Sequence, residues 1–223
     1  MITETIKQAT NAFKAAPWSV AGSLNDSCCE VLDRLNWPGH DGKHPLRTLG
    51  VTSSRLGEGV STLAAHLATA AAGRQNQRVI LVDAHLRRPA AGKMFGVSDA
   101  LGLAECVGCN ESPLEILQPT ALENLYVLSA GRSRGTPARV FDSADLPGVV
   151  RDLAGHAALV IFDLPPAGQA SCVSRLTAML DGVLLVVEAE LVPWESVARV
   201  KELLSRAGAR IVGAVLNKWR DGN

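Results

Sequence analysis

The sequence has little of two features that would point to a particular class of function: excess charge of one sign and long apolar runs. Lysine plus arginine and aspartate plus glutamate both number 22, so the formal net charge is zero and nothing favours a nucleic-acid binder. No apolar run approaches the roughly 20 residues of a membrane-spanning helix, and the first residues lack the apolar centre of a signal peptide. We therefore expect a cytoplasmic protein that does not bind nucleic acid.

The cysteines do not have the pattern of a disulfide framework. The five cysteines are an odd number at irregular places, which favours reduced thiols over a disulfide framework. Cys106 and Cys109 form a CxxC, the form of half a zinc or iron–sulfur site or of a redox pair. No second CxxC or histidine pair follows at ligand spacing, and GLAECVGC predicts a short helix that ends in a turn. We interpret this pair, and Cys28, Cys29 and Cys172, as structural.

What the chain does contain is a regular alternation of aliphatic strands and helical segments. The predicted strands are 49–52, 79–83, 125–129, 159–163, 182–187 and 211–216, and the predicted helices are 61–73, 113–117, 146–154, 171–180 and 193–207. Strands of this kind separated by helices indicate an α/β fold with a doubly wound, mostly parallel sheet. We place this domain at residues 46–223. Residues 1–45 are interpreted as a peripheral segment, with a helix at about 26–37 and a loop at 38–45.

The segment GEGVST, residues 57–62, has the frame of a phosphate-binding loop between a strand and a helix. Gly57 and Gly59 allow successive backbone N–H groups to turn toward a phosphate, and the helix dipole adds positive potential. Ser61 is placed to offer its hydroxyl to a magnesium ion. We therefore expect ATP or ADP with Mg²⁺ as the ligand. The candidate nucleotide-binding residues of this segment are Gly57, Glu58, Gly59, Val60, Ser61 and Thr62.

Val60 stands where a phosphate-binding loop carries its lysine, and Ser54 replaces the first glycine. Loss of a cation that contacts the transferred phosphoryl group costs about 3–5 kcal/mol of transition-state stabilisation. Binding tolerates this loss better, because the backbone N–H groups and Mg²⁺ still hold the phosphates. Arg55, five residues before Val60, either supplies a replacement charge or is an exposed loop arginine.

Two aspartates end predicted strands on the same edge of the sheet. Asp83 closes VILVD and Asp163 closes LVIFD. An apolar strand that ends in aspartate is typical of a Walker B element, whose carboxylate holds Mg²⁺ directly or through water. The alternative is that each aspartate only caps the next helix. In combination with the loop, the pair favours a nucleotide site.

Five segments, in this order, carry a resemblance to a known family: LGVTSSRLGEGVSTLAAHLA, VILVDAHLRRP, LVIFDLPPAG, DGVLLVVEAE and GARIVGAVLNK. With them, the chain resembles the bacterial tyrosine kinases of capsule and exopolysaccharide biosynthesis. These kinases belong to the deviant Walker, MinD/ParA-like class of P-loop ATPases. The resemblance runs over residues 30–218. It implies that Ser61 and Asp163 serve Mg²⁺, that Asp83 is the candidate catalytic base, and that Asn217 lies near the adenine.

The chain also departs from this family. His85 replaces a second acidic residue and His66 an amide, so with Val60 three changes fall on one pocket. His85 is either a pH-sensitive ligand or base, or a polar residue that opens a turn. Arg87 and Arg88 face phosphate or a partner, or are solvated. The other three histidines, His40, His44 and His156, receive no role.

Two further departures concern assembly and substrate. The family's oligomerisation motif survives only as Glu30, with Asp33 and Asn36 in its arginine positions, so a ring is in question although a homo-oligomer stays open. The C-terminal tyrosine cluster is missing. The single tyrosine, Tyr126, lies in a predicted strand and is interpreted as a core residue.

Three functions follow from these observations. The leading hypothesis is a degenerate, pseudokinase-like regulator of capsular or exopolysaccharide biosynthesis or export, in which nucleotide binding is weak or lost. The resemblance implies that its partner is the cytoplasmic tail of a transmembrane copolymerase-like protein, which would bring it to the inner face of the membrane. The second is an active kinase or ATPase that uses Arg55 or a partner residue. The third is a partition or cell-positioning switch, which the neutral charge disfavours.

Overall fold

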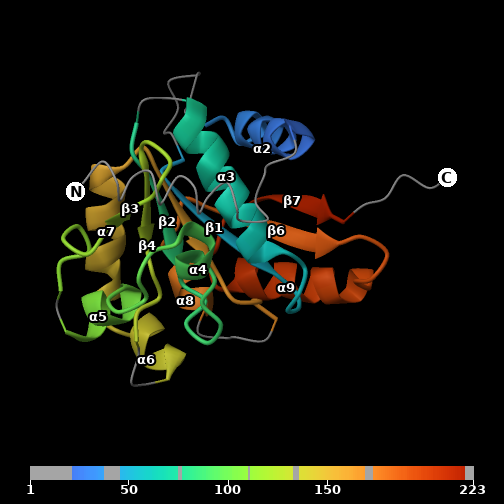
Figure 1. The fold of residues 1–223 in the computed structure, drawn as a ribbon. Coiled ribbons are helices and arrows are strands. Elements are labelled where there is room, and N and C mark those ends of the chain that lie inside the picture. The colour runs from blue at the N-terminus through green and yellow to red at the C-terminus, as the bar shows by residue number, and fades with distance from the viewer. Residues whose placement is uncertain are drawn as a thin grey trace.

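The computed structural model describes residues 22–37, 46–74, 77–109, 111–132, 136–168 and 173–218. Within them a seven-stranded sheet has the order β3-β4-β2-β5-β1-β6-β7 and lies between two layers of helices (Figure 1). Every described strand pair is parallel except β3–β4. The doubly wound, mostly parallel sheet is therefore confirmed. The strands are β1 (Thr48–Ser53), β2 (Val79–Asp83), β3 (Gln118–Pro119), β4 (Leu125–Leu128), β5 (Leu159–Asp163), β6 (Gly182–Glu188) and β7 (Ile211–Asn217).

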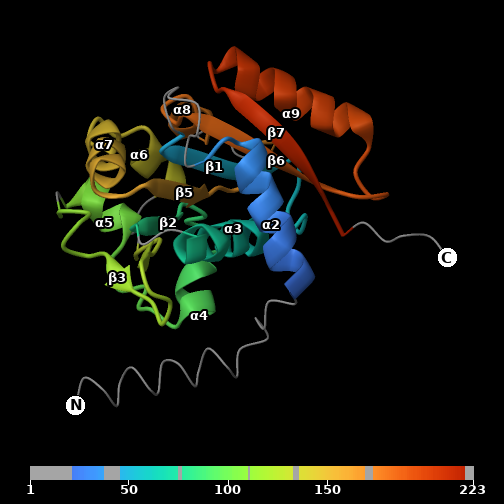
Figure 2. The same cartoon turned by 90° about the horizontal axis from the view of Figure 1, so that it is seen from above.

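The helices cover both faces of the sheet, as the view from above shows (Figure 2). One layer consists of α2 (Gly22–Arg34), α3 (Val60–Arg74) and α4 (Ala91–Phe95). The other consists of α5 (Leu103–Gly108), α6 (Pro137–Phe141), α7 (Leu146–His156), α8 (Val173–Thr177) and α9 (Trp194–Arg206). Among these helices there is none of the length and apolarity that crossing a bilayer requires.

Helix α2 packs against α3 and contributes to the same core. Leu32 and Trp37 are fully buried there, and the Trp37 indole N–H donates to the carbonyl of Ala158 at 3.4 Å. Burial of these side chains stabilises the attachment of α2 to the sheet. The segment before residue 46 thus carries core residues. The division into segments 1–45 and 46–223 stays a prediction.

The predicted helix at 113–117 is wrong. The chain forms only a turn here, in which the N–H of Glu115 donates to the carbonyl of Ser112 at 3.2 Å. Five residues are too few to repay helix nucleation without strong packing. Conversely, α4 and α6 were not predicted, because a five-residue helix shows no measurable periodicity.

The connections bring several strand ends to one edge. Strand β1 lies between β5 and β6, and the strands that follow it in the sequence are added on both of its sides. The place where the strand order reverses in this way is the topological switch point, where such sheets bind ligands. Asp83 and Asp163 end adjacent strands in direct register. The loop after β1 and the ends of β2, β5, β6 and β7 therefore gather around one place.

Candidate functional site

The loop between β1 and α3 has the backbone conformation that its glycines allow. Gly57 and Gly59 both have φ of +93°, in the left-handed region that other residues seldom adopt. A Cβ atom on Gly59 would lie 2.2 Å from the side-chain nitrogen of Asn217. A larger residue at Gly59 is therefore excluded by backbone strain and by lack of space.

Val60 is the first residue of α3 and belongs to the hydrophobic core. Its side chain is 8% exposed and lies in the same apolar cluster as Leu63 and Ala64. No positive charge can come from this position. The loop thus keeps its backbone frame and the N-terminus of a 15-residue helix, but not the usual ammonium group.

Glu58 points inward and supports the loop. It is 2% exposed, and its carboxylate accepts hydrogen bonds from the Ser54 hydroxyl at 2.8 Å, the Arg55 N–H at 2.5 Å and the Glu188 N–H at 3.1 Å. Its carboxylate therefore braces the loop from inside and ties it to the end of β6. The serine that replaces the first glycine is one of the donors.

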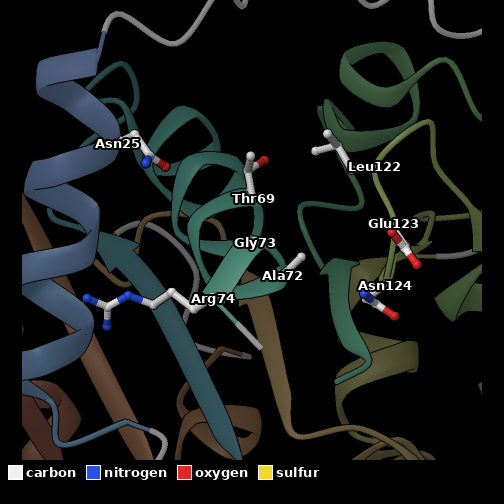
Figure 3. Close-up of a pocket in the computed structure, with 8 residues that line it drawn as sticks. All are labelled: Asn25, Thr69, Ala72, Gly73, Arg74, Leu122, Glu123 and Asn124. Carbon is white, nitrogen blue, oxygen red and sulfur yellow. The ribbon is translucent and has the colours of Figure 1, made fainter. Parts of the chain in front are cut away.

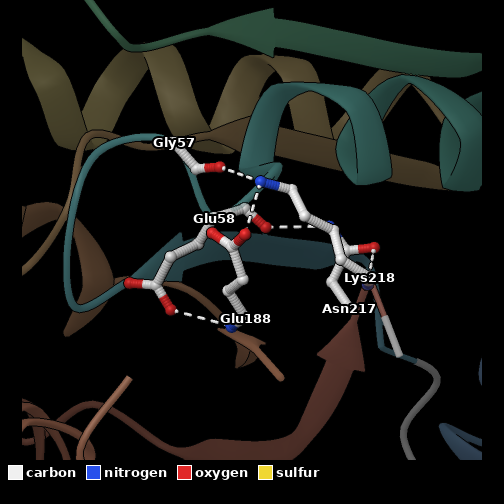
Figure 4. A network of polar contacts seen from close by, with 5 residues as sticks. All are labelled: Gly57, Glu58, Glu188, Asn217 and Lys218. Carbon is white, nitrogen blue, oxygen red and sulfur yellow. Dashed lines mark hydrogen bonds and ion pairs between the residues drawn. The ribbon is translucent and has the colours of Figure 1, made fainter. Parts of the chain in front are cut away.

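The end of β7 contacts the outer side of the same loop (Figure 4). The amide nitrogen of Asn217 donates to the carbonyl of Glu58 at 2.8 Å. The Lys218 ammonium donates to the carbonyl of Gly57 at 2.8 Å and pairs with the Glu188 carboxylate at 2.9 Å. Lys218 and Glu188 were missed from the sequence. The only signal for Lys218 was a basic residue directly after Asn217.

Asp83 is fully buried and saturated with hydrogen bonds. One carboxylate oxygen accepts from the N–H of His85 at 3.0 Å, and the other accepts from the N–H groups of Ala90 at 2.7 Å and Ala91 at 2.9 Å. Burial raises the pKa of Asp83, and these three N–H groups oppose the rise. The carboxylate has the contacts of a cap on the turn into α4. Its assignment as catalytic base stays a prediction.

Asp163 is the carboxylate with spare capacity. It is 1% exposed, and its Oδ1 atom has no hydrogen-bond partner among the described residues. Burial, and then repulsion from Asp83, raise its pKa from 3.8 to about 8, against the effect of a hydrogen bond from Ser61. A carboxylate and a hydroxyl at this place fit Mg²⁺, which prefers oxygen ligands and binds with the help of substrate phosphates. The described residues include no cluster of three or more side chains that could hold a metal alone.

A cavity of about 330 Å³ lies in front of the loop, large enough for a small ligand. Residues from three segments line it: Ser53, Arg55, Leu56, Gly57, Gly59, Val60, Ser61, Thr62, His85, Arg88, Leu164 and Pro166. The guanidinium groups of Arg55 and Arg88 make no hydrogen bond or ion pair with any residue that the structure describes. The cavity therefore combines an intact backbone frame with two free positive charges.

His85 opens the turn that leads to these arginines. Its Nδ1 atom accepts from the N–H of Arg88 at 3.2 Å, and its carbonyl accepts from the same N–H at 2.8 Å. The imidazole therefore shapes the turn and also lines the cavity. Arg87 is exposed and does not line the cavity.

Other residues singled out in the sequence lie elsewhere. His66 is buried in α3, and burial lowers its pKa. Tyr126 is half-buried on β4, with the Arg78 guanidinium 4.8 Å above its ring. Cys106 is buried, whereas Cys109 is exposed at the end of α5. None of these residues lines the cavity.

A second depression lies between α2, the end of α3 and the turn before β4 (Figure 3). It is lined by Asn25, Thr69, Ala72, Gly73, Arg74, Leu122, Glu123 and Asn124. It is separated from the phosphate loop by the length of α3, about 20 Å. The arginine here is already bound, since its guanidinium makes two hydrogen bonds to the Asp33 carboxylate at 2.7 and 2.9 Å.

Fold, glycine loop and strand-end aspartates together define a P-loop NTPase of the ParA/MinD-like kind. The sequence model of the ParA family, described as NUBPL iron-transfer P-loop NTPase, matches residues 46–219. Tyrosine-protein kinase YwqD of Bacillus subtilis is 30% identical over 172 residues, which cover 77% of this chain and 72% of YwqD. The chain belongs to the bacterial tyrosine-protein kinases within this class, a family of capsule synthesis.

Two further comparisons agree. Tyrosine-protein kinase CpsD of Streptococcus agalactiae is 26% identical over 173 residues, covering 77% of this chain and 75% of CpsD. The crystal structure of the chimerical protein CapA2B2 matches with a TM-score of 0.81 at 24% identity, over 92% of this chain and 88% of that chain. The structural likeness concerns the fold.

Proposed function

We propose that this protein is a degenerate member of its family, which binds Mg·ADP or Mg·ATP weakly and regulates polysaccharide synthesis or export without efficient phosphoryl transfer. Its partner is the cytoplasmic tail of a transmembrane copolymerase-like protein. That partner follows from the family resemblance. Nucleotide with Mg²⁺ is the general ligand of P-loop NTPase folds.

One observation carries this proposal: Val60 packs into the core at the position of the catalytic cation. In phosphoryl transfer the protein contributes mainly positioning and charge stabilisation. Without the lysine, the developing charge on the phosphoryl oxygens loses its nearest partner. Binding depends more on the backbone frame of the loop, which Gly57 and Gly59 preserve.

The alternative function is an active kinase or ATPase in which a guanidinium replaces the ammonium. A specific observation favours it, since Arg55 and Arg88 both line the cavity. In this case Arg55→Gln or Arg88→Gln would abolish activity. Arg87→Gln is the matched control, because Arg87 is exposed like its neighbour Arg88 but does not line the cavity.

Titration calorimetry with Mg·ADP and Mg·ATP, together with hydrolysis and phosphate transfer to protein tyrosine, tests the proposal. We expect binding in the micromolar to millimolar range and turnover at background. Val60→Lys should raise the rate of ATP hydrolysis tenfold or more, and Val60→Lys combined with His85→Asp should raise it further. A tenfold increase corresponds to about 1.4 kcal/mol of transition-state stabilisation. If the wild type hydrolyses ATP as fast as Val60→Lys, the degenerate assignment is refuted. If the wild type binds no nucleotide, the protein acts as a structural scaffold and not as a nucleotide sensor.

A further inference from the structure

The residues at the end of β7 donate hydrogen bonds to the phosphate loop, which the sequence did not predict. We propose that Lys218, together with Asn217, is a positioning residue that holds the phosphate loop in its binding conformation from outside. It does so in a chain that has lost the lysine inside the loop.

Two consecutive loop carbonyls are held by two consecutive residues of the strand end (Figure 4). The Gly57 carbonyl accepts from the Lys218 ammonium and the Glu58 carbonyl accepts from the Asn217 amide, both at 2.8 Å. Carbonyls held in this way fix the peptide planes of the loop. The N–H groups of these peptides therefore have their direction set before a phosphate arrives.

The ammonium group is itself fixed in place. It pairs with the Glu188 carboxylate at 2.9 Å, and the Lys218 N–H donates to the Asn217 side-chain oxygen at 2.9 Å. Lys218 has φ of +59°, a conformation that persists in a non-glycine residue only where its surroundings determine it. This lysine is thus committed to the loop and to Glu188, and it does not serve as a free cation for the phosphates.

Strand β6 closes the arrangement from the other side. Glu188 uses its carboxylate for Lys218 and its N–H for the buried Glu58 carboxylate, which also binds the Arg55 N–H. Removing the ammonium would free the Gly57 carbonyl and leave the Glu188 carboxylate unpaired. We name this set of contacts, made by Gly57, Glu58, Glu188, Asn217 and Lys218, the loop clamp.

The clamp deepens the proposed function, since it explains how a cradle without its lysine stays formed. Its test does not need nucleotide. Amide hydrogen exchange by NMR on the ligand-free protein reports on the Arg55 and Glu188 N–H groups, which both bind the Glu58 carboxylate. We expect Lys218→Met to accelerate exchange at both by about tenfold, the effect of losing one charged hydrogen bond.

Lys201→Met is the matched control, because Lys201 is exposed on α9 and does not line the cavity in front of the loop. It should leave both amides unchanged. Lys218→Arg, which keeps a donor and a charge, should restore most of the protection. If Lys218→Met does not fold, Glu188→Ala tests the same contact from its other end. Unchanged exchange in Lys218→Met or Glu188→Ala would overturn the clamp.

A titration with Mg·ADP separates this proposal from the function on which it rests. If the wild type binds, Lys218→Met should weaken binding about fivefold or more, while Lys201→Met does not. Equal affinity in Lys218→Met and wild type would refute a role in binding. If the wild type binds no nucleotide, the proposed nucleotide function fails, and the exchange experiment still decides whether the clamp exists.

Discussion

Asp163 is the residue whose chemistry depends most on its surroundings. Burial, and then Asp83, raise its pKa to about 8. An acid whose folded-state pKa lies above the unfolded value of 3.8 binds its proton more tightly when folded. Its contribution to the free energy of unfolding is therefore full below the unfolded value and declines as pH rises toward about 8.

Asp163→Asn should remove this pH dependence. We expect the free energy of unfolding of the wild type to fall by about 1–3 kcal/mol more than that of the variant between pH 6 and 8, at about 1.4 kcal/mol per unit. Urea unfolding at a series of pH values, with EDTA present, measures this difference. Asp152→Asn, on the exposed side of α7, is the control. Parallel curves for wild type and Asp163→Asn would show that Asp163 is ionised when folded.

The two cysteines of the CxxC should differ sharply in reactivity. Burial raises the pKa of Cys106 to about 12, whereas Cys109 is exposed. Because the thiolate is the reactive form, a thiol reagent such as dithionitrobenzoate should modify Cys109 quickly and Cys106 only after unfolding. Cys109→Ser should remove the fast modification from this pair, as peptide mapping of the labelled protein would show. A fast phase that survives in this variant and maps to Cys106 would contradict the burial.

Among single residues, those of a local motif could be predicted from the sequence, whereas those that act through tertiary contacts could not. Gly57, Gly59 and Ser61 belong to a loop whose spacing is visible in the chain. Lys218 and Glu188 act on that loop from positions more than 100 residues away, as the 161-residue separation between Lys218 and Gly57 illustrates. No local pattern marks such a pair, because it depends on the sheet order that places β6 beside β1 and β7 beside β6.

At the scale of elements, α2 is joined to α3 by an ion pair at the surface. The Arg74 guanidinium binds both oxygens of Asp33, with side-chain exposures of 26% and 58%. Because this ion pair is bidentate, we expect it to stabilise the fold by as much as exposed ion pairs do at most. Asp33, the residue at the first arginine position of the family's oligomerisation motif, is therefore already bound within its own chain.

We expect Arg74→Met to lower the free energy of unfolding by about 0.5–1 kcal/mol in urea titration. Arg206→Met provides the comparison, since Arg206 pairs with Glu202 within one helix at 2.6 Å and both are more exposed. Its loss should be about 0.3 kcal/mol. Equal losses in the two variants would mean that the α2–α3 contact depends only on the apolar residues beneath it.

Element prediction succeeded where periodicity is long and failed where it is short. Helices α3, α7 and α9 have 11 to 15 residues each. The apolar stripes of α7 and α9 and the alanine-rich composition of α3 are visible in the sequence. Helices α4 and α6 have five residues and depend on the core around Ala91 and Phe141. In the turn at 113–117, Leu114, Ile116 and Leu117 also pack against the core, so their apolar pattern indicated burial but not a helix.

For the whole molecule, we expect that α2 does not assemble a ring. Asp33 and Asn36 replace the two arginines of the motif, and Asp33 is bound to Arg74 of its own chain. We expect a mass near 23.5 kDa by light scattering coupled to size exclusion at micromolar concentration. A stable mass several times larger, independent of dilution, would show that another surface assembles the protein.

The sheet and its edge could be predicted as a whole because aliphatic strands alternating with helices allow few topologies. The same argument placed Asp83 and Asp163 at one edge, and their register confirms it. It did not show that Asp83 would have both oxygens occupied while Asp163 would have one spare. Such differences arise from the exact path of the 84–91 turn.

The loop clamp has a consequence for control from a distance. Within the described sheet β7 pairs only with β6, so its other backbone edge remains open, and its last residue is one of those that grip the glycine loop. A peptide that adds itself alongside β7 as an eighth strand would therefore change nucleotide affinity without touching the nucleotide. Allosteric input and phosphate recognition would then share a single strand.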